Sequence, residues 1–233
     1  MKIKTSTKKF KALSRLGFNI NDHPKILYDK MKKKKWVRFK NALPRKTTEY
    51  GALLLAKQRL KYFYGNITER TILNLYKKGK SLRGNNGVNF LKQLEKRLDT
   101  ILFRSRFSNS FEDVRQLISH GHIYVNGKVV KTSSFVIEPG DLISVKPSSH
   151  GMVFKKVLKS LEIYLNITNN SSTFDVNNLQ NKYKLLTQPD YLEVNLNILE
   201  CAFINNPSIE QLTYPFPLDL KRIIQYYEFQ RKV

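Results

Sequence analysis

Apolar residues recur every three or four positions through the middle of the chain, a spacing typical of amphipathic helices. The pattern predicts helices over 48–64, 68–78, 88–105 and 110–119, of which 88–105 has the strongest stripe. Residues suited to cap or end these helices are Thr47 or Thr48, Gly65, Thr68, Gly79 and Ser110. The acidic pair Glu112-Asp113 lies in a first turn, where the helix dipole favours anions.

The hydrophobic period then changes to strict alternation, which predicts strands. Residues 122–125 and 128–131 flank Asn126-Gly127, a typical two-residue hairpin turn because both central positions need a positive φ. A turn over 138–141 leads to a third short strand over 142–146. We therefore expect 97–146 to be two helices packed on a small antiparallel sheet.

The two ends of the chain have weaker patterns. Residues 1–47 hold most of the lysines and no sustained period, so we expect an arm with short helical pieces. A helix is predicted over 153–165, followed by an Asn-rich insertion over 166–181. Pro189–Val194 is a candidate strand, and 195–233 is expected to pack as a tail.

Positive charge is concentrated at the start of the chain. The net charge is +24, of which residues 1–60 contribute +15 and residues 61–96 contribute +6. Such a block repels itself unless a polyanion neutralises it, which points to nucleic acid or to an anionic membrane surface. Trp36 and Phe39 are interleaved with cations instead of forming a clean apolar face, which favours nucleic acid. No apolar run approaches the roughly 18 residues needed to span a bilayer.

The sequence offers little for metal or nucleotide chemistry. Cys201 is the single cysteine, and His120-Gly-His122 has no third ligand nearby in sequence. The loop Gly84–Gly87 lacks the spacing of phosphate-binding loops. Asp99 is expected to pair with a neighbouring cation. We therefore expect no cofactor, no metal site and no catalytic residue.

The polar face of the unit 97–146 is the candidate site. Arg97 and Arg104 are seven residues apart and are expected on one helical face, and further polar residues follow on the next helix and at the start of the hairpin. A cationic face of this kind suits the phosphates and 2′-hydroxyls of structured RNA. Its expected members are Arg97, Arg104, Arg115, Gln116, Ser119, His120, His122 and Lys128.

Several runs of residues resemble the small ribosomal subunit protein S-four family. Similar to the RNA-binding domain of that family are Arg97-Leu-Asp99, Arg115-Gln-Leu-Ile-Ser-His120, Ile123-Tyr-Val-Asn-Gly127 and Pro139-Gly-Asp141. Similar to its helical domain and C-terminal tail are Tyr50, Lys57–Gly65, Thr68–Arg70, Gly84–Gly87, Pro189–Val194 and Ile223–Phe229.

The resemblance implies an α+β fold in which a basic helical N-terminal domain carries an inserted helix-helix-β-hairpin RNA-binding module and a C-terminal tail. The expected parts are an arm over 1–47, a helical ribosomal-protein domain over 48–96, the module over 97–146, a helix with the insertion over 147–188, and the tail over 189–233. In the helical domain it implies RNA contacts from Lys57, Arg59, Lys61, Arg70, Lys77, Lys78, Lys80 and Arg83.

The implied function is that of a non-enzymatic constituent of the small ribosomal subunit. Family members bind a multi-helix junction in the 5′ domain of small-subunit rRNA and help to nucleate assembly of the subunit body. The resemblance also implies contacts with neighbouring small-subunit proteins and with mRNA where it enters the subunit, and no membrane.

Two alternatives use the same RNA-binding module. An RNA-modifying enzyme would need a catalytic domain, for which the 87 residues after Lys146 are few. A free RNA chaperone that rescues stalled large subunits would be shorter and would lack the helical domain over 48–87.

The basic, acid-free segment 1–20 has the composition of an organellar transit peptide, and we interpret it as a retained arm. The 20 Asn residues and the many Lys, Ile, Tyr and Phe are typical of AT-rich organelle genes. They indicate the mitochondrial matrix, in the small subunit of the mitochondrial ribosome, with the plastid as the alternative.

Overall fold

The computed structural model describes residues 16, 48–108, 110–158 and 189–230. They belong to two compact units. The second unit runs from Thr68 to Thr213, and the first contains the described residues that precede Thr68 or follow Thr213 in the sequence. This division separates the predicted helix 48–64 from the predicted helix 68–78. We had expected both helices in one domain, over 48–96. The predicted arm 1–47, Leu16 excepted, and the predicted insertion 166–181 lie outside the described residues.

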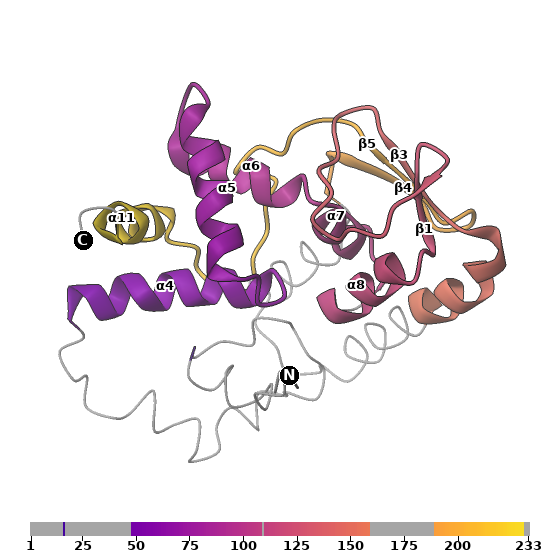
Figure 1. Cartoon of the computed structure of the whole chain (residues 1–233), viewed down its shortest axis with the longest axis horizontal. Helices are drawn as coiled ribbons and strands as arrows, with labels where there is room; N and C mark the ends of the chain where they lie inside the picture. Colours follow the sequence, from indigo (N-terminus) through magenta and orange to yellow (C-terminus); the bar gives the residue numbers. More distant parts are fainter. Residues whose placement is uncertain (1–15, 17–47, 109, 159–188, 231–233) are drawn as a thin grey trace, which may run out of the picture. The chain divides into compact units, whose positions relative to one another are not determined.

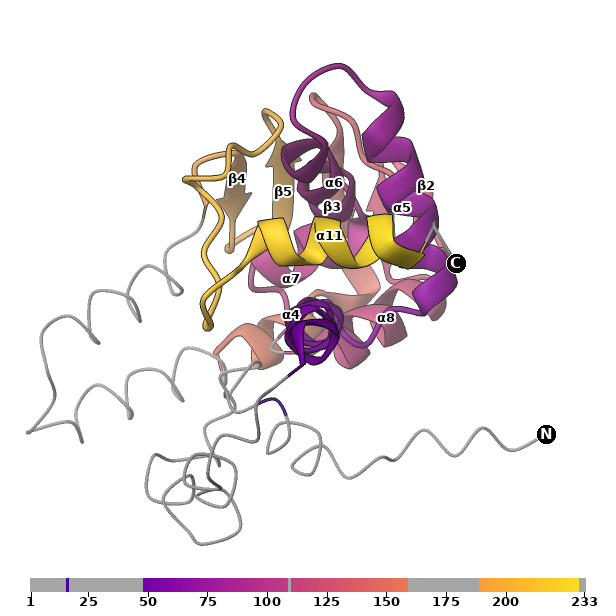
Figure 2. The ribbon, with the colours of Figure 1, turned by 90° about the vertical axis from the view of Figure 1, so that its left-hand side faces the viewer.

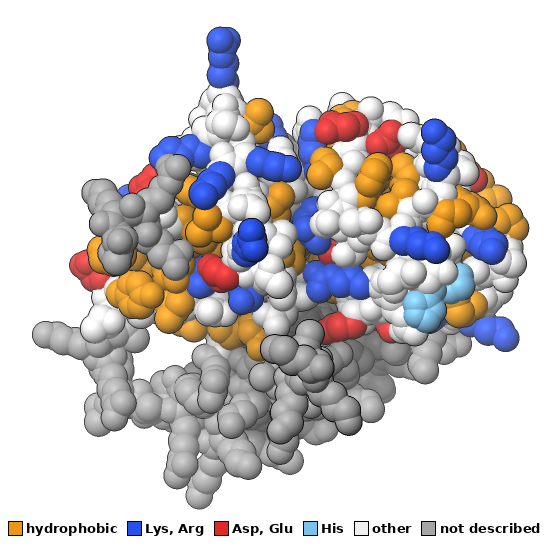
Figure 3. Space-filling view, viewed as in Figure 1, with side chains coloured by type: hydrophobic (Ala, Val, Ile, Leu, Met, Phe, Trp, Pro, Cys, Tyr) orange, Lys and Arg blue, Asp and Glu red, His pale blue; other side chains and the backbone are white. Residues whose placement is uncertain are grey.

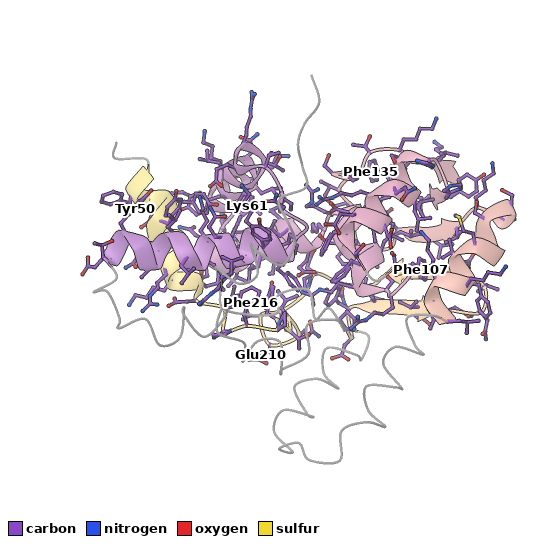
Figure 4. All side chains as sticks on the ribbon, turned by 90° about the horizontal axis from the view of Figure 1, so that it is seen from below. Tyr50, Lys61, Phe107, Phe135, Glu210 and Phe216 are labelled. Carbon is purple, nitrogen blue, oxygen red and sulfur yellow. The ribbon has the colours of Figure 1, made fainter. Side chains whose placement is uncertain are left out.

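The first unit contains helix α4 (Glu49–Phe63) and helix α11 (Leu220–Gln230). The predicted cap of α4 is confirmed, because the Thr48 hydroxyl accepts a hydrogen bond of 3.2 Å from the backbone N–H of Gly51. Rings join the two helices: Tyr50, at the start of α4 in Figure 4, lies 5.9 Å from Tyr226 between ring centroids. At the other end of α4, Phe63 and Phe216 lie 6.1 Å apart.

The second unit begins with helices α5 (Glu69–Ser81) and α6 (Asn86–Glu95). Thr68 caps α5 as predicted, and its hydroxyl accepts from the N–H of Thr71 at 3.4 Å. The prediction that Gly79 ends this helix is wrong, because Gly79 lies inside α5. A Cβ at Gly79 would come within 2.8 Å of the backbone nitrogen of Phe90. This glycine therefore permits close packing of α5 on α6 rather than ending the helix.

The single predicted helix over 88–105 is wrong, because the chain leaves the helical conformation between α6 and α7 (Leu98–Arg104). Arg97 is extended, with φ −74° and ψ 139°. Two backbone hydrogen bonds explain the break: Leu98 N–H donates to the Phe135 carbonyl at 2.9 Å, and Ile137 N–H donates to the Lys96 carbonyl at 2.8 Å. The segment 135–137 therefore pairs with the backbone at the break between α6 and α7.

Helix α8 (Phe111–Ser119) and the hairpin agree with the sequence prediction. The Ser110 hydroxyl accepts from the N–H of Asp113 at 3.2 Å, which confirms the cap. Strands β1 (Ile123–Val125) and β2 (Lys128–Val129) are joined by Asn126 and Gly127, with φ of 49° and 76°. Both turn residues therefore have the positive φ that the sequence required.

The hairpin belongs to a five-stranded antiparallel sheet of order β2-β1-β3-β5-β4. β3 (Leu142–Val145) is the predicted third strand, and β4 (Leu192–Asn195) overlaps the predicted strand at Pro189–Val194. β5 (Glu200–Phe203), which lies beside β4 in Figure 2, was not predicted. The C-terminal part of the chain thus adds two strands to the sheet predicted within 97–146 instead of serving only as a tail.

The core of the second unit lies between the sheet and its helices. Helices α7 and α8 lie against one face of the sheet (Figure 1), and residues 150–158 form a further helix after η1 (Pro147–Ser149). Phe107, labelled in Figure 4, lies in this core. Fully buried with it are Leu98, Ile101, Val114, Ile118, Ile123, Ile143 and Phe203. A mixed α+β fold is therefore confirmed.

Candidate nucleic-acid interface

Helix α8 exposes its polar side because its other side is held in the core. Val114, Leu117 and Ile118 are buried, while Gln116 and Ser119 are exposed. The exposed His120 follows at the end of the helix. The residues predicted for the polar side of this helix therefore do lie together at the surface.

Arg115 is held in place on this surface from two sides. Its Nε donates to Oδ2 of Asp99 at 3.1 Å, and its guanidinium carbon lies 5.8 Å from the ring centroid of Phe111. The ring of Phe111 in turn stacks on Phe103, with 4.3 Å between centroids. The side chain of Arg115 is 29% exposed, so a side chain held by these contacts still reaches the surface.

The turn from α8 into β1 places two histidines side by side. The ring centroids of His120 and His122 are 6.0 Å apart. His122 Nδ1 shares a hydrogen bond of 2.8 Å with the Ser149 hydroxyl, which fixes the ring. Among the residues that the structure describes, no group of three His, Cys, Asp or Glu side chains is arranged to hold a metal ion. These two histidines are thus polar groups beside α8.

Lys131, which was not among the predicted RNA contacts, joins this region. A Cβ built on Gly121 would lie 3.4 Å from Cε of Lys131, so the lysine passes over the turn between the two histidines. The hairpin register could have revealed it. Val125 pairs with Lys128, so counting three residues back from Val125 reaches His122, and counting three residues on from Lys128 reaches Lys131 opposite it. We define the hairpin face as Arg115, Gln116, Ser119, His120, His122 and Lys131. Lys128, which was also predicted to contact RNA, is exposed in β2 beside the hairpin turn.

Arg97 and Arg104 do not lie on this face, and the prediction that they share an exposed helical face is wrong. Arg97 precedes α7 and is bound to Asp99 through two hydrogen bonds of 2.9 Å. Arg104 is bound to Glu95 at 2.8 Å and 3.3 Å, and its Nη1 donates to the Thr213 carbonyl at 2.9 Å. Both arginines are oriented by buried carboxylates, which holds their guanidinium groups against the protein.

Glu95 connects segments that are distant in the sequence. Its carboxylate is fully buried and also accepts a hydrogen bond of 3.1 Å from the hydroxyl of Tyr191. α6, α7 and the segment before β4 therefore meet at one ion pair. Removing one partner of such a buried pair leaves an uncompensated charge, which typically costs about 3–5 kcal/mol.

The cations expected on α4 are placed differently from those expected on α5. Lys57 is buried; its Nζ donates to the Tyr226 hydroxyl at 3.1 Å and lies 4.3 Å from that ring's centroid. Arg59 donates to the carbonyl of Leu16 at 3.2 Å, and burial together with the nearby Arg222 lowers the pKa of Arg59. Lys61 is half-buried. An RNA contact by Lys57 is therefore not supported by the geometry.

Helix α5 presents its cations to solvent. Ile72, Leu75, Tyr76 and Gly79 form its buried side. Lysines and arginines cover the region of α5 in Figure 3, and histidines lie beside further cations on the part that carries the sheet. The exposed cations of α5 and of the loop that follows it are Arg70, Lys77, Lys78, Lys80 and Arg83, all of which were predicted to contact RNA.

Within the described ranges, none of the helices combines the length and the apolar character needed to cross a membrane. In the second unit, exposed polar and cationic residues cluster on the hairpin face and on α5.

Comparison with known proteins identifies the family. The family described as "Ribosomal protein S4/S9 N-terminal domain" matches residues 4–95, and the family described as "S4 domain" matches residues 96–143. A small ribosomal subunit protein uS4m from Reclinomonas americana is 34% identical over 225 residues, which cover 94% of this chain and 82% of that protein.

Bacterial proteins are similar to a comparable extent. The small ribosomal subunit protein uS4 of Pelagibacter ubique is 35% identical over 182 residues, 78% of each chain, and that of Rickettsia bellii is 31% identical over 221 residues, 94% of this chain and 96% of its own. Matches of this length set aside the alternative of an RNA-modifying enzyme. The chain belongs to the uS4 family of small ribosomal subunit proteins, which are structural and non-enzymatic components of the ribosome.

Proposed function

We propose that this chain is a primary rRNA-binding protein of the small ribosomal subunit and that it binds a helical junction in the 5′ domain of the rRNA. The observation that carries the proposal is the hairpin face, where Arg115 is held beside exposed hydrogen-bonding groups on a module with a continuous hydrophobic core. Groups held in one geometry recognise the shape of a folded RNA, because phosphates and 2′-hydroxyls are arranged differently at a junction and in a regular duplex.

The exposed cations of α5 supply a second source of affinity. Lys77, Lys78 and Lys80 lie off the buried side of the helix, where phosphates can reach them. Each phosphate that is neutralised releases counterions, so the logarithm of the binding constant falls with the logarithm of salt by about 0.7–0.9 per contact. With contacts from both surfaces, binding should be strongly dependent on salt.

The direct test is binding of the full chain to a 5′-domain rRNA fragment across a salt series. We expect tight binding with a steep salt slope and weak binding to a duplex of equal length and charge. Equal affinity for the two RNAs would show that the shape of the fold is not recognised, and a flat salt response would contradict phosphate contacts.

A role in nucleating assembly of the subunit body follows from early binding to a junction. Chemical probing of rRNA reconstituted with and without the chain tests it: we expect junction nucleotides to become protected before other proteins are added. Protection that requires neighbouring small-subunit proteins would assign the chain to a later step. Crosslinking within intact subunits would identify those neighbours, and also mRNA if the chain lies where mRNA enters.

We further propose that the chain works in the mitochondrial ribosome. Support comes from the similarity to the uS4m of Reclinomonas americana and from the 20 Asn residues, which are typical of proteins encoded by AT-rich organelle genes. Sedimentation of ribosomal subunits released from purified organelles tests this proposal. We expect the chain in small subunits from the mitochondrial matrix. Recovery from plastid subunits alone would overturn it.

A further inference from the structure

Asp99 is a fully buried carboxylate that two arginines share. Arg97 donates to it through Nε and Nη2, each at 2.9 Å, and Arg115 donates through Nε at 3.1 Å. The side chain of Arg97 is 5% exposed and that of Arg115 is 29% exposed. Both arginines compensate the carboxylate charge; Arg97 does so from the interior, and Arg115 extends from the same carboxylate toward the surface.

Glu95 is a second buried carboxylate in this module, and its arginine partner is less exposed than Arg115. It is as deeply buried as Asp99, and its arginine partner, Arg104, is 9% exposed and also binds the Thr213 carbonyl. Glu95 also accepts a hydrogen bond from Tyr191, another core residue. The ion pair of Glu95 and Arg104 links internal segments, whereas Arg115, the second partner of Asp99, belongs to the hairpin face.

The contacts of Arg115 define the direction of its guanidinium. Nε is bound to Asp99 from the interior, and the stacked pair Phe111 and Phe103 supports the group from the side. An exposed arginine loses rotamer freedom when it binds, and a side chain fixed in advance avoids much of that loss. The planar fork of arginine also suits a phosphate in a defined orientation, which an ammonium group does not.

We propose that Asp99 is a positioning residue for RNA recognition: it holds the guanidinium of Arg115 in the orientation that meets a backbone phosphate of the folded rRNA. Arg97 serves the same purpose indirectly, because its two hydrogen bonds fix the carboxylate itself. Asp99 does not touch RNA. The inference rests on the proposed function, since it assigns how one contact of the hairpin face is prepared.

The test compares rRNA affinity for five full-length variants whose folding is checked by circular dichroism: Asp99→Asn, Arg115→Lys, Glu95→Gln, Arg115→Met, and the double variant of Asp99→Asn with Arg115→Met. Asp99→Asn and Arg115→Lys each disturb the hold on the guanidinium, and Arg115→Lys keeps the charge. We expect both to weaken affinity about tenfold, the size of a lost charge-assisted contact. Glu95→Gln is the matched control in an equally buried pair, and its folded fraction should bind as the unmodified protein does. Asp99→Asn in an Arg115→Met background should change affinity less than about twofold, because nothing remains to be positioned.

Unchanged affinity of Arg115→Lys would overturn the proposal, even if Asp99→Asn does not fold. So would an equal loss from Asp99→Asn with and without Arg115, or an equal loss from Glu95→Gln. Failure of the unmodified chain to bind the rRNA fragment is a different result, and it would refute the proposed function instead.

Discussion

The packing of α5 on α6 can be tested with Gly79→Ala. A Cβ at this position would lie 2.8 Å from the nitrogen and 2.9 Å from the Cα of Phe90, and 3.2 Å from the carbonyl carbon of Asn89. All three are backbone atoms, so no side chain can rotate away and the two helices must separate.

The expected magnitude combines two opposing effects. Overpacking against a helix backbone costs about 3 kcal/mol at the upper end of its usual range, and alanine in a helix interior gains about 1 kcal/mol over glycine. The net loss in the free energy of unfolding is about 2 kcal/mol, which lowers the melting temperature of a unit of this size by roughly 4–8 °C.

The assay is thermal unfolding by circular dichroism, with Gly151→Ala as the matched control. Gly151 also lies in a helix, but no atom stands within 4 Å of its added Cβ. We expect this control to melt at the same temperature or slightly higher. If Gly79→Ala melts as the control does, the close approach of the two helices is wrong.

Three further predictions concern the hairpin face and the core. Arg115→Glu should weaken rRNA binding by about 1–3 kcal/mol, because a charge-assisted contact is lost and a repulsion is added; filter binding at moderate salt measures it, and unchanged affinity would remove Arg115 from the site. Lys131→Glu should weaken binding more than Lys221→Glu, which makes the same charge change on α11; equal effects would mean that only net charge matters. Burial raises the pKa of the Cys201 thiol from 9.0 to about 11, against a smaller opposing effect of the Ser105 hydroxyl. Since the thiol ionises at lower pH in the unfolded chain, its burial should stabilise the protein fully below pH 9 and lose about 2–3 kcal/mol of that stability by pH 11. The free energies of unfolding of the protein and of Cys201→Ala, measured from pH 8 to 11, should therefore converge as the pH rises. A constant difference between them would contradict the burial.

Local signals in the sequence predicted the elements that local chemistry determines. Thr48, Thr68 and Ser110 are helix caps as expected, because a cap involves residues within one turn. Asn126 and Gly127 fix the hairpin, because a two-residue turn also fixes the register of the strands beside it.

The errors lie where residues distant in the sequence decide the local structure. The break before α7 depends on backbone bonds to Phe135 and Ile137, while the apolar stripe continues through it. β5 is predictable only once β3 is known to offer a free edge, because its own pattern is four residues long.

The assignment of charged side chains shows the same limit. Lys57 is buried by Tyr226, a residue 169 positions away, and Arg104 is bound to a carboxylate that also binds Tyr191. Sequence spacing cannot distinguish an exposed cation from one that pairs across the fold. The residues predicted on α8 lie at the surface as expected, because the buried stripe of one short amphipathic helix fixes the direction of its polar side.

The central claim is that the hairpin face lies on folded rRNA. The most direct measurement is a cryo-electron microscopy map of a small ribosomal subunit that contains this chain. We predict rRNA phosphates within hydrogen-bonding distance of the guanidinium of Arg115 and of the ammonium of Lys131. Density that places these two side chains against bulk solvent or another protein, with no ribonucleotide in reach, would contradict the account.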